Sequence, residues 1–331
     1  MIARVIVRKT LFALLFCATS LLGSAAAEEF SVQSFDMRGD MGLLDDFGPT
    51  GASWAEGNRI LVCDRRYNVF HLFDLEGRRY RFMDYPHRMS DAHFNGLCHW
   101  KDNQFFVTGS HYHPNNNTRI VESRSEMREI RLVGEQIDPA SDKQNYRPDR
   151  ALRASYYYGE STELNGEITG IAFDTRNNRV FLGISQCVAR DGNVVLLEGK
   201  LDQFLARSND FELKFLNANL KPEMDPNLKV QYSLSDLAYL PGKGLVLLFS
   251  ARSEDGKSFG ANQIWFMKGG FGPAKLVKKD LAIGNRGSGI ALRPSSTKDE
   301  YEAAIVCDNN MEDTKIPSRL LLLKGLRFPM R

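Results

Sequence analysis

The chain of 331 residues has little charge imbalance, few cysteines and only one long apolar run. Lysine and arginine number 43 against 41 acidic residues, so the formal net charge is only +2. A chain so close to neutral has no general attraction to nucleic acid or to an anionic membrane surface. No CxxC pair occurs among the five cysteines, which argues against a zinc knuckle or a thioredoxin-type site.

Several other signatures are absent as well. The sequence contains no phosphate-binding P-loop and no dinucleotide fingerprint, and it has no contiguous D-x-D-x-D-G calcium loop. These absences argue against a nucleotide-binding protein of either type and against an EF-hand calcium-binding protein. What remains is a chain whose organisation must be found in its repeats and in its first residues.

Residues 1–27 predict an export signal peptide. Arg4, Arg8 and Lys9 form a basic start, residues 11–22 are an apolar run, and residues 24–27 supply the small side chains that a signal peptidase needs. The apolar run is shorter than the roughly 20 residues that span a bilayer, so we expect cleavage rather than a membrane anchor. Cleavage would leave residues 28–331 as one domain of net charge −1, in the periplasm or outside the cell, with no transmembrane segment.

An internal repeat organises the rest of the chain. Each copy has a small or turn residue, a short apolar strand, a polar turn and a second, more hydrophobic strand. The copies start at Gly51, Gly96, Gly170, Asp236 and Gly289. The position two after each start is small, and the next is usually bulky: Ser53 and Trp54, Cys98 and His99, Ala172 and Phe173, Ala238 and Tyr239, Ala291 and Leu292. This alternation fits sheets that stack closely face to face.

The repeat predicts an all-β fold, a β-propeller of four-stranded antiparallel sheets, because further strands follow most copies. The starts are 45, 74, 66 and 53 residues apart, whereas a plain blade takes roughly 40–45. We therefore expect six blades, with five or seven left open. A strand near residues 30–37 would complete the last blade, a long polar insertion loop lies near residues 134–165, and helix is confined to a turn at residues 201–206.

Short motifs in the second and third copies carry a family resemblance. They are Asn95-Gly96-Leu97, residues 106–111 with the sequence Phe-Val-Thr-Gly-Ser-His, and residues 167–172 with the sequence Glu-Ile-Thr-Gly-Ile-Ala. With these motifs the chain resembles a family of uncharacterised bacterial exported propellers, a domain of unknown function related in fold to phytase-like propellers. The resemblance implies the same fold and adds no reaction, because the family has no well-established one.

The chain departs from that family at four positions. Asn95 and Thr169 stand where family members often have an acidic residue before the glycine. Ser185 and Gln186 follow the Leu-Gly strand where an arginine and a proline are common. If those charged groups serve a ligand in the family, this chain has changed the ligand or lost it.

Strand ends identify the candidate site. In a propeller, residues just before the first strand and just after the second lie near one mouth of the axial channel, which is the default pocket. The ligand-binding candidates at this mouth are Asn95, Ser110, Glu167, Thr169, Gln186, Asp236, Arg252 and Asn309.

The histidines are concentrated, since five of six lie between His87 and His113. His99 takes a bulky position of the repeat and should pack in the core. His111, beside Ser110, is the candidate catalytic general base near neutral pH. His111 and His113 would share one side of an extended segment and could bind a transition metal, although no third ligand is evident.

Asp64 and Asp308 are the candidate metal ligands, because a hard divalent cation such as calcium takes several oxygen ligands. The alternative for each is turn chemistry, in which the carboxylate bonds to nearby backbone. After cleavage the cysteines are Cys63, Cys98, Cys187 and Cys307, which allow three pairings. Cys63 and Cys307 hold equivalent positions in the first and last copies, too far apart for a bridge, so free buried thiols are expected.

Two classes of function fit these observations. The first is a propeller, expected to be a monomer, that binds a small molecule, a glycan or an envelope component at the mouth. The second is a metal-assisted hydrolase, phosphoesterase-like or lactonase-like, with its site on the axis. A purely structural envelope scaffold is a third, weaker alternative. Binding ranks above hydrolysis because no complete catalytic set can be assembled from the sequence.

Overall fold

The computed structural model describes residues 30–44, 47–67, 69–84, 93–110, 112–113, 116–120, 124, 127–141, 145–146, 167–185, 192–310 and 315–329. The predicted signal peptide at residues 1–27 lies outside this part of the chain. So do His111, Gln186, Cys187 and most of the insertion predicted at residues 134–165. None of the helices in the described part is both long and apolar enough to cross a membrane.

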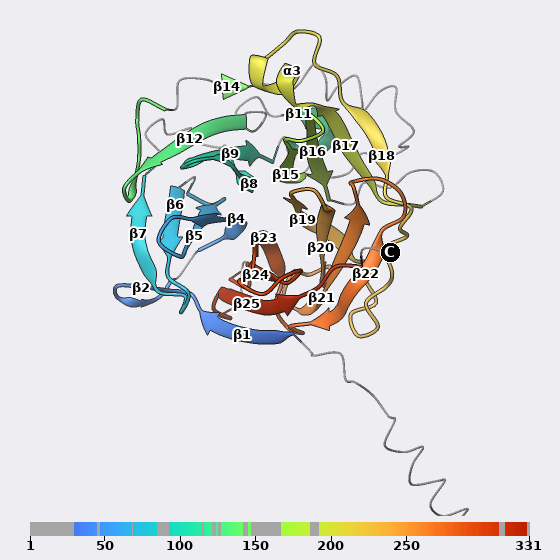
Figure 1. Ribbon diagram of the computed structural model, residues 1–331. Coiled ribbons are helices and arrows are strands. Elements are labelled where there is room, and N and C mark those ends of the chain that lie inside the picture. The colour runs from blue at the N-terminus through green and yellow to red at the C-terminus, as the bar shows by residue number, and fades with distance from the viewer. Residues whose placement is uncertain are drawn as a thin grey trace, which may run out of the picture.

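Five antiparallel sheets surround a common axis (Figure 1). Blade 1 contains β4 (Pro49–Ala55), β5 (Arg59–Asp64), β6 (Val69–Phe73) and β7 (Arg79–Met83). Blade 2 contains β8 (Phe94–Lys101), β9 (Gln104–Gly109), β12 (Met127–Val133) and β13 (Gln136–Ile137), with β14 (Asn145–Tyr146) also paired to β12. Blade 3 contains β15 (Ile168–Asp174), β16 (Arg179–Ile184), β17 (Val195–Lys200) and β18 (Lys214–Asn217).

The last two blades follow the same order. Blade 4 contains β19 (Ser233–Leu240), β20 (Gly244–Arg252), β21 (Phe259–Lys268) and β22 (Lys275–Leu281). Blade 5 contains β23 (Gly287–Pro294), β24 (Tyr301–Cys307), β25 (Arg319–Leu326) and β1 (Ser31–Asp36). The first strand of the chain therefore forms the outer strand of the last blade, and its register runs from Ser31 opposite Lys324 to Asp36 opposite Arg319. The predicted closing strand is confirmed.

The expected count of six blades is corrected to five. The long spacing between Gly96 and Gly170 holds the hairpin of β10 (Tyr112–His113) and β11 (Asn116–Ile120). The spacing between Gly170 and Asp236 holds α3 (Leu201–Ala206) and the connection from β18 to β19. A further hairpin pairs β2 (Arg38–Gly39) with β3 (Gly42–Leu43). No sixth four-stranded sheet occurs in the described ranges, so the extra residues are insertions between blades.

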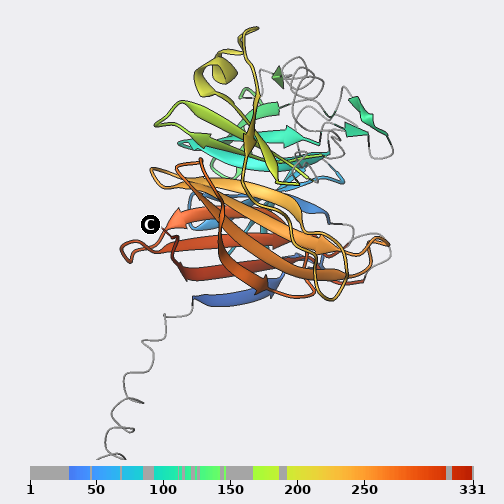
Figure 2. The ribbon, with the colours of Figure 1, turned by 90° about the vertical axis from the view of Figure 1, so that its right-hand side faces the viewer.

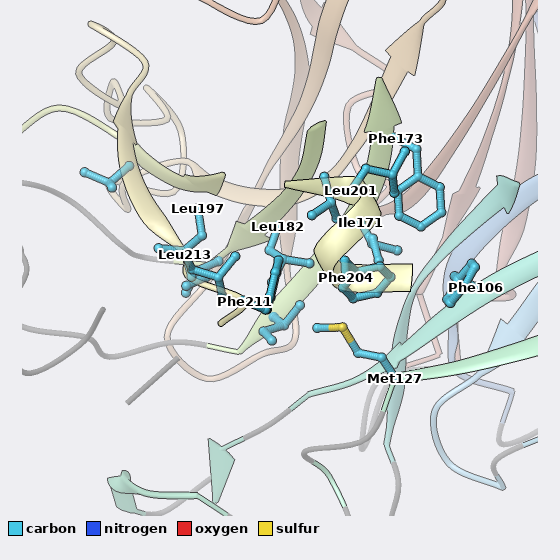
Figure 3. Close-up of a cluster of buried hydrophobic side chains, with 14 residues drawn as sticks. Phe106, Met127, Ile171, Phe173, Leu182, Leu197, Leu201, Phe204, Phe211 and Leu213 are labelled. Atoms are coloured by element: carbon cyan, nitrogen blue, oxygen red, sulfur yellow. The ribbon is translucent and has the colours of Figure 1, made fainter. Parts of the chain in front are cut away.

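Five hydrophobic clusters lie between neighbouring blades, one for each pair. Between blades 2 and 3, Phe106 of β9 and Met127 of β12 face Phe173 of β15 and Phe204 of α3 (Figure 3). The Phe106 and Phe173 rings meet edge to face with centroids 5.2 Å apart. The other four clusters fill the remaining pairs, and the last of them joins blade 5 to blade 1. Each sheet is thus buried on both faces, which explains the apolar character of the second strands. Figure 2 shows the sheets stacked in side view.

The expectation that His99 packs in the core is wrong. His99 is exposed, and its Nε2 lies 2.6 Å from the carbonyl oxygen of Asp102. The pairing of β8 with β9 shifts register between His99 and Lys101, and Trp100 turns toward the core instead. The Trp100 and Phe173 rings lie 5.4 Å apart, edge to face. His99 lies close to the turn at Asp102, where Trp100 rather than His99 contacts the core, and the repeat alone does not reveal this change.

The innermost strands β4, β8, β15, β19 and β23 approach each other more closely than side chains would allow. A Cβ atom on Gly96 would lie 2.7 Å from the Cα atom of Gly170 in the next blade. One on Gly289 would lie 2.8 Å from the carbonyl oxygen of Thr50, across the junction of blades 5 and 1. Innermost strands of non-adjacent blades also contact each other, β4 with β15 and β8 with β23. The axis is narrow because four of the five repeat starts are glycines, which have no side chain.

We expect Gly96→Ala to lower the free energy of unfolding by about 3 kcal/mol, because the new methyl group meets backbone that cannot move aside. Gly134→Ala is the matched control. Gly134 has a φ of +62° and no neighbouring atom within 4 Å of an added Cβ, so it should lose only about 1 kcal/mol for the left-handed conformation. Denaturant unfolding of both variants measures the difference. Equal losses would contradict close packing at Gly96.

Candidate functional site

The candidate site lies at one end of the propeller, where the innermost strands begin and the second strands end. We call this end the mouth. The hairpin turns that join each first strand to its second lie at the opposite end, for example around Asn58, Asp102 and Asn178, each with a positive φ. The predicted site residues in the described part are therefore on or just inside one end of the molecule, as the strand order required.

Every innermost strand carries an irregularity near the mouth, where its pairing with the second strand shifts register. The residue at each shift is polar, and together these residues form what we call the belt: Thr50, Asn95, Thr169, Ser235 and Ser288. β-Bulges commonly re-aim a side chain in this way. The belt includes two of the predicted ligand residues, Asn95 and Thr169, and it explains why polar residues recur just before the repeat starts.

The belt links blades by hydrogen bonds from side chain to backbone. Thr50 Oγ1 donates to the carbonyl oxygen of Phe94 at 2.6 Å, and Asn95 Nδ2 donates to that of Ile168 at 2.8 Å. Ser288 Oγ donates to the carbonyl oxygen of Pro49 at 2.5 Å, which ties blade 5 to blade 1. Each bond crosses to the equivalent strand of the next blade. These three junctions are therefore held by the same contact.

The other two junctions differ. Ser235 Oγ lies 2.5 Å from Ser250 Oγ in its own blade. Thr169 Oγ1 is buried and has no hydrogen-bond partner among the residues described here. At the junction of blades 3 and 4 the belt bond is missing, and a buried hydroxyl without a partner costs stability.

Asp236 occupies the position that glycine holds in the other four repeats. Its carboxyl group is buried and accepts hydrogen bonds from the backbone N–H of Leu237 and of Ile290, both at 2.8 Å. Ile290 belongs to blade 5, so the carboxyl group spans the junction of blades 4 and 5. Burial raises the pKa of Asp236 well above its ordinary value, although both N–H donors oppose that rise. The contacts place this predicted ligand residue within the packed ring.

A raised pKa in the folded state gives a specific pH dependence. The folded chain holds the Asp236 proton more tightly than the unfolded chain, so this contribution to stability is present at acid pH and is lost as the pH rises through the folded-state pKa. Relative to Asp236→Asn, the wild-type chain should lose up to about 1.4 kcal/mol per pH unit above the unfolded value near 4. Denaturant unfolding of both chains between pH 4.5 and 7.5 measures this, and a constant difference would contradict it.

Asp308 holds two arginines at the mouth. Its Oδ2 atom lies 3.1 Å from Arg65 Nη2 and 3.1 Å from Arg286 Nη1. The Asp308 side chain is fully buried, whereas those of Arg65 and Arg286 are about one-fifth exposed. Oδ1 of Asp308 has no hydrogen-bond partner in the described part of the chain. The carboxylate thus lies beneath the two guanidinium groups and fixes them side by side.

Charges from three further blades act on Arg286. Burial and repulsion by Arg65 and Arg252 lower the pKa of Arg286 to about 10, against the attraction of Asp308 and Glu167. Arg252 is exposed at the end of β20 in blade 4. Glu167 precedes β15 in blade 3, and its Oε2 lies 3.4 Å from Asn95 Nδ2 of blade 2. The structure thus pairs Asn95 with Glu167, and it pairs Asp308 with Arg65 and Arg286, two arginines that were not among the predicted ligands.

Asn309 positions the backbone of Arg286 through hydrogen bonds of its side chain. Its Oδ1 accepts from the backbone N–H of Arg286 at 2.8 Å, and its Nδ2 donates to Asn285 Oδ1 at 2.7 Å. The side chain is buried, so its role in these contacts is to position the backbone of Arg286. Ser110 is buried as well, with no hydrogen-bond partner for its Oγ within the described ranges.

Asp64 lies next to Arg65 but faces a different neighbour. Its Oδ1 accepts from the backbone N–H of Arg66 at 2.8 Å, and its Oδ2 lies 3.6 Å from Nε2 of His71. His71 is buried among Phe47 and Phe73, and burial lowers its pKa. A neutral His71 beside Asp64 is a feature that sequence reasoning missed. All five residues of β6 are buried, and His71 is the one polar residue among them.

No group of three or more His, Cys, Asp or Glu side chains in the described segments is arranged to hold a metal ion. Asp308 is occupied by two guanidinium groups, and Asp64 by backbone and His71. The predicted cation at these two residues stays a prediction. The predicted base His111 and ligand Gln186 lie outside the described residues.

The pattern Gly256-Lys257-Ser258-Phe259-Gly260 matches the G-x-S-x-G signature of serine hydrolases. It lies in the hairpin between β20 and β21, where Ser258 donates its backbone N–H to Ser253 Oγ at 2.9 Å. A nucleophile elbow requires a turn from a strand into a helix, and here a strand follows. The pattern therefore occurs here by chance and does not mark a nucleophile.

Three of the cysteines are described, and all are free: Cys63, Cys98 and Cys307. Cys63 and Cys307 are buried, in agreement with the expected free thiols. Burial raises the pKa of Cys63 to about 12, so the thiol stays protonated and unreactive at neutral pH.

A scan against protein-family models finds no matching family, and a search of curated proteins finds no matching relative. Solved structures with a similar arrangement include the tail fiber of Staphylococcus aureus phage P68, with 11% identity and a TM-score of 0.48 over 95% of this chain and 56% of that one. This chain thus spans little more than half the length of the phage protein.

Two other solved structures cover most of both chains. The PQQ-bound aldose sugar dehydrogenase of Streptomyces coelicolor has 14% identity and a TM-score of 0.45 over 89% of this chain and 98% of that one. Virginiamycin B lyase of Staphylococcus aureus has 12% identity and a TM-score of 0.40 over 89% of this chain and 99% of the lyase chain. Identities at this level establish no shared activity.

Proposed function

We propose that this chain is a β-propeller binding protein that takes a small molecule, a glycan or an envelope component at the mouth. The observation that carries the proposal is the ion-paired cluster at the mouth, where Arg65 of blade 1 and Arg286 of blade 5 both lie 3.1 Å from Asp308 Oδ2. These groups stand on strand ends of a ring whose innermost strands pack backbone against backbone. A rigid scaffold with polar side chains at its loop end is the usual arrangement of a binding site.

The belt supports the same proposal. Hydrogen bonds between blades hold the strand ends at a fixed spacing, so a ligand would meet a preorganised surface and lose little affinity to ordering. Export to the periplasm, proposed from residues 1–27, would place this mouth where envelope components and incoming solutes are available. The resemblance to exported bacterial propellers is consistent with that location.

The alternative, a metal-assisted hydrolase, has no specific observation in its favour among the described residues. The mouth groups that the structure brings together are arginines, amides and ion-paired carboxylates. Such groups bind and orient a ligand, and none of them is a nucleophile with an adjacent base.

The mouth can be tested with a panel of sugars, sugar acids and small metabolites, screened by thermal shift and followed by calorimetry. We expect Arg252→Ala to weaken a ligand about tenfold, the loss of one charge-assisted contact. Arg176→Ala is the matched control, since Arg176 is also exposed but lies in the turn between β15 and β16 at the opposite end. The ligand should be recovered unchanged after incubation. Equal binding by Arg252→Ala, or metal-dependent conversion of the ligand, would contradict the proposal.

A further inference from the structure

The belt of hydrogen bonds is interrupted on both sides of blade 4. The junctions of blades 1 with 2, 2 with 3 and 5 with 1 each have a bond from a belt side chain to a carbonyl group of the next blade. Toward blade 3, Thr169 Oγ1 has no partner among the described residues. Toward blade 5, Ser235 Oγ lies 2.5 Å from Ser250 Oγ of its own blade. The mouth end of β19 therefore lacks the belt contact that ties the other innermost strands together.

The carboxyl group of Asp236 makes the polar contact across the junction of blades 4 and 5. Its Oδ1 accepts from the backbone N–H of Leu237 in β19, and its Oδ2 accepts from the backbone N–H of Ile290 in β23, both at 2.8 Å. On the other side Oδ1 packs against Gly170 of blade 3, where an added Cβ atom would overlap it. One buried side chain thus contacts three blades at the centre of the ring, where β15, β19 and β23 meet (Figure 1).

No positive charge compensates this carboxyl group. Asp236 is fully buried, and within the described ranges no Lys, Arg or His side chain forms an ion pair with it. The strands packed against β19 are β15, β16, β20 and β23. The ionisable side chains of these strands and of β19 itself lie at the opposite end of the ring, except for the exposed Arg252 at the mouth: Asp174, Arg179, Tyr239 and Arg293.

The other titratable groups that the charge of Asp236 reaches are two thiols. They are those of Cys63 in β5 and Cys98 in β8, and burial raises the pKa of each to about 12. Both thiols are neutral near pH 7 and supply no countercharge. An ionised Asp236 would therefore be stabilised in the closed ring only by two backbone N–H groups, and an unpaired charge in such a place is costly.

We propose that Asp236 is a pH-sensitive switch: when its carboxyl group loses its proton, the edges of β19 and β23 separate locally at the mouth. Separation lets water reach the carboxylate, which removes the cost of burying its charge. The hydrophobic clusters on both sides of blade 4 hold the outer parts of the sheets together, so the opening is confined to the strand ends near the axis. It increases the distance between the belt residues Ser235 and Ser288 and so widens the mouth.

The switch goes beyond the proposed function and does not depend on it. It follows from the interrupted belt and from the carboxyl group that stands where the other four repeats have glycine. A ligand at the mouth would experience the change in spacing, but the opening itself occurs in the ligand-free chain.

The test is hydrogen exchange, because the amides of Leu237 and Ile290 are the two donors to Asp236. Exchange is measured between pH 4.5 and 7.5 and corrected for the intrinsic effect of pH. The closed ring holds the Asp236 proton and the open form releases it near the ordinary value of about 4, so the open population should rise up to about tenfold per pH unit. Amides of β4 in blade 1 are the internal control and should keep their protection.

Three variants assign the effect to the carboxyl group. Asp236→Asn keeps an oxygen acceptor and cannot ionise, so it should abolish the pH dependence at Leu237 and Ile290. Asp236→Gly restores the residue of the other repeats and should abolish it too, with faster exchange at Ile290 at every pH because the acceptor is lost. Asp299→Asn is the matched control, since Asp299 is exposed in the turn between β23 and β24 at the opposite end and should behave as the wild type does.

Three results would overturn the switch. The first is corrected exchange at Leu237 and Ile290 that does not change with pH in the wild-type chain. The second is an equal change in β4, which indicates global unfolding rather than local opening. The third is a pH dependence that persists in Asp236→Asn or in Asp236→Gly. If one variant fails to fold, the other and the wild-type comparison still decide. The proposed function fails on different evidence, since the absence of a ligand for the mouth leaves these exchange rates unchanged.

Discussion

The close approach of the five innermost strands is the constraint on which the rest of this structure depends. Backbone meets backbone at Gly51, Gly96 and Gly289, and an added Cβ atom at Gly170 would meet the carboxyl group of Asp236. With this spacing at the axis, the outer parts of each sheet pack through large apolar side chains. The hydrophobic clusters between blades supply most of the stabilisation, while the glycines set the geometry in which those clusters can form.

The geometry of the mouth follows from the close packing of the five innermost strands. Because the strands are so close, a side chain at a bulge in one blade reaches the carbonyl group of the next, as Thr50 and Asn95 do. The fourth repeat breaks the pattern, since Asp236 replaces glycine and uses its carboxyl group to make the contact that backbone makes elsewhere. Strand ends held in this way can carry arginines at fixed positions, which free loops could not do at the same entropic cost.

Much of the fold could be predicted from the chain itself. The register of small and bulky residues identified the five repeats, the strand at residues 31–36 that closes the ring, and the short helical segment after β17. The blade count was wrong because spacing alone does not distinguish an inserted hairpin from an additional sheet. The position of His99 was wrong because, close to the turn at Asp102, Trp100 rather than His99 contacts the core.

The candidate site was predicted only in outline. Strand order is enough to place Asn95, Glu167, Arg252 and Asp308 at one end, since residues at equivalent strand ends must lie near each other in a radial array. The pairing of Arg65 with Arg286 depends on side-chain directions across the junction of blades 5 and 1. The burial of His71 beside Asp64 depends on the aromatic rings packed around it. The sequence by itself determined the repeated strands and their polar ends, because hydrophobic periodicity is local. Only the tertiary structure decided the number of blades and the partners at the mouth, because contacts such as that of Arg65 with Asp308 join residues more than 200 positions apart.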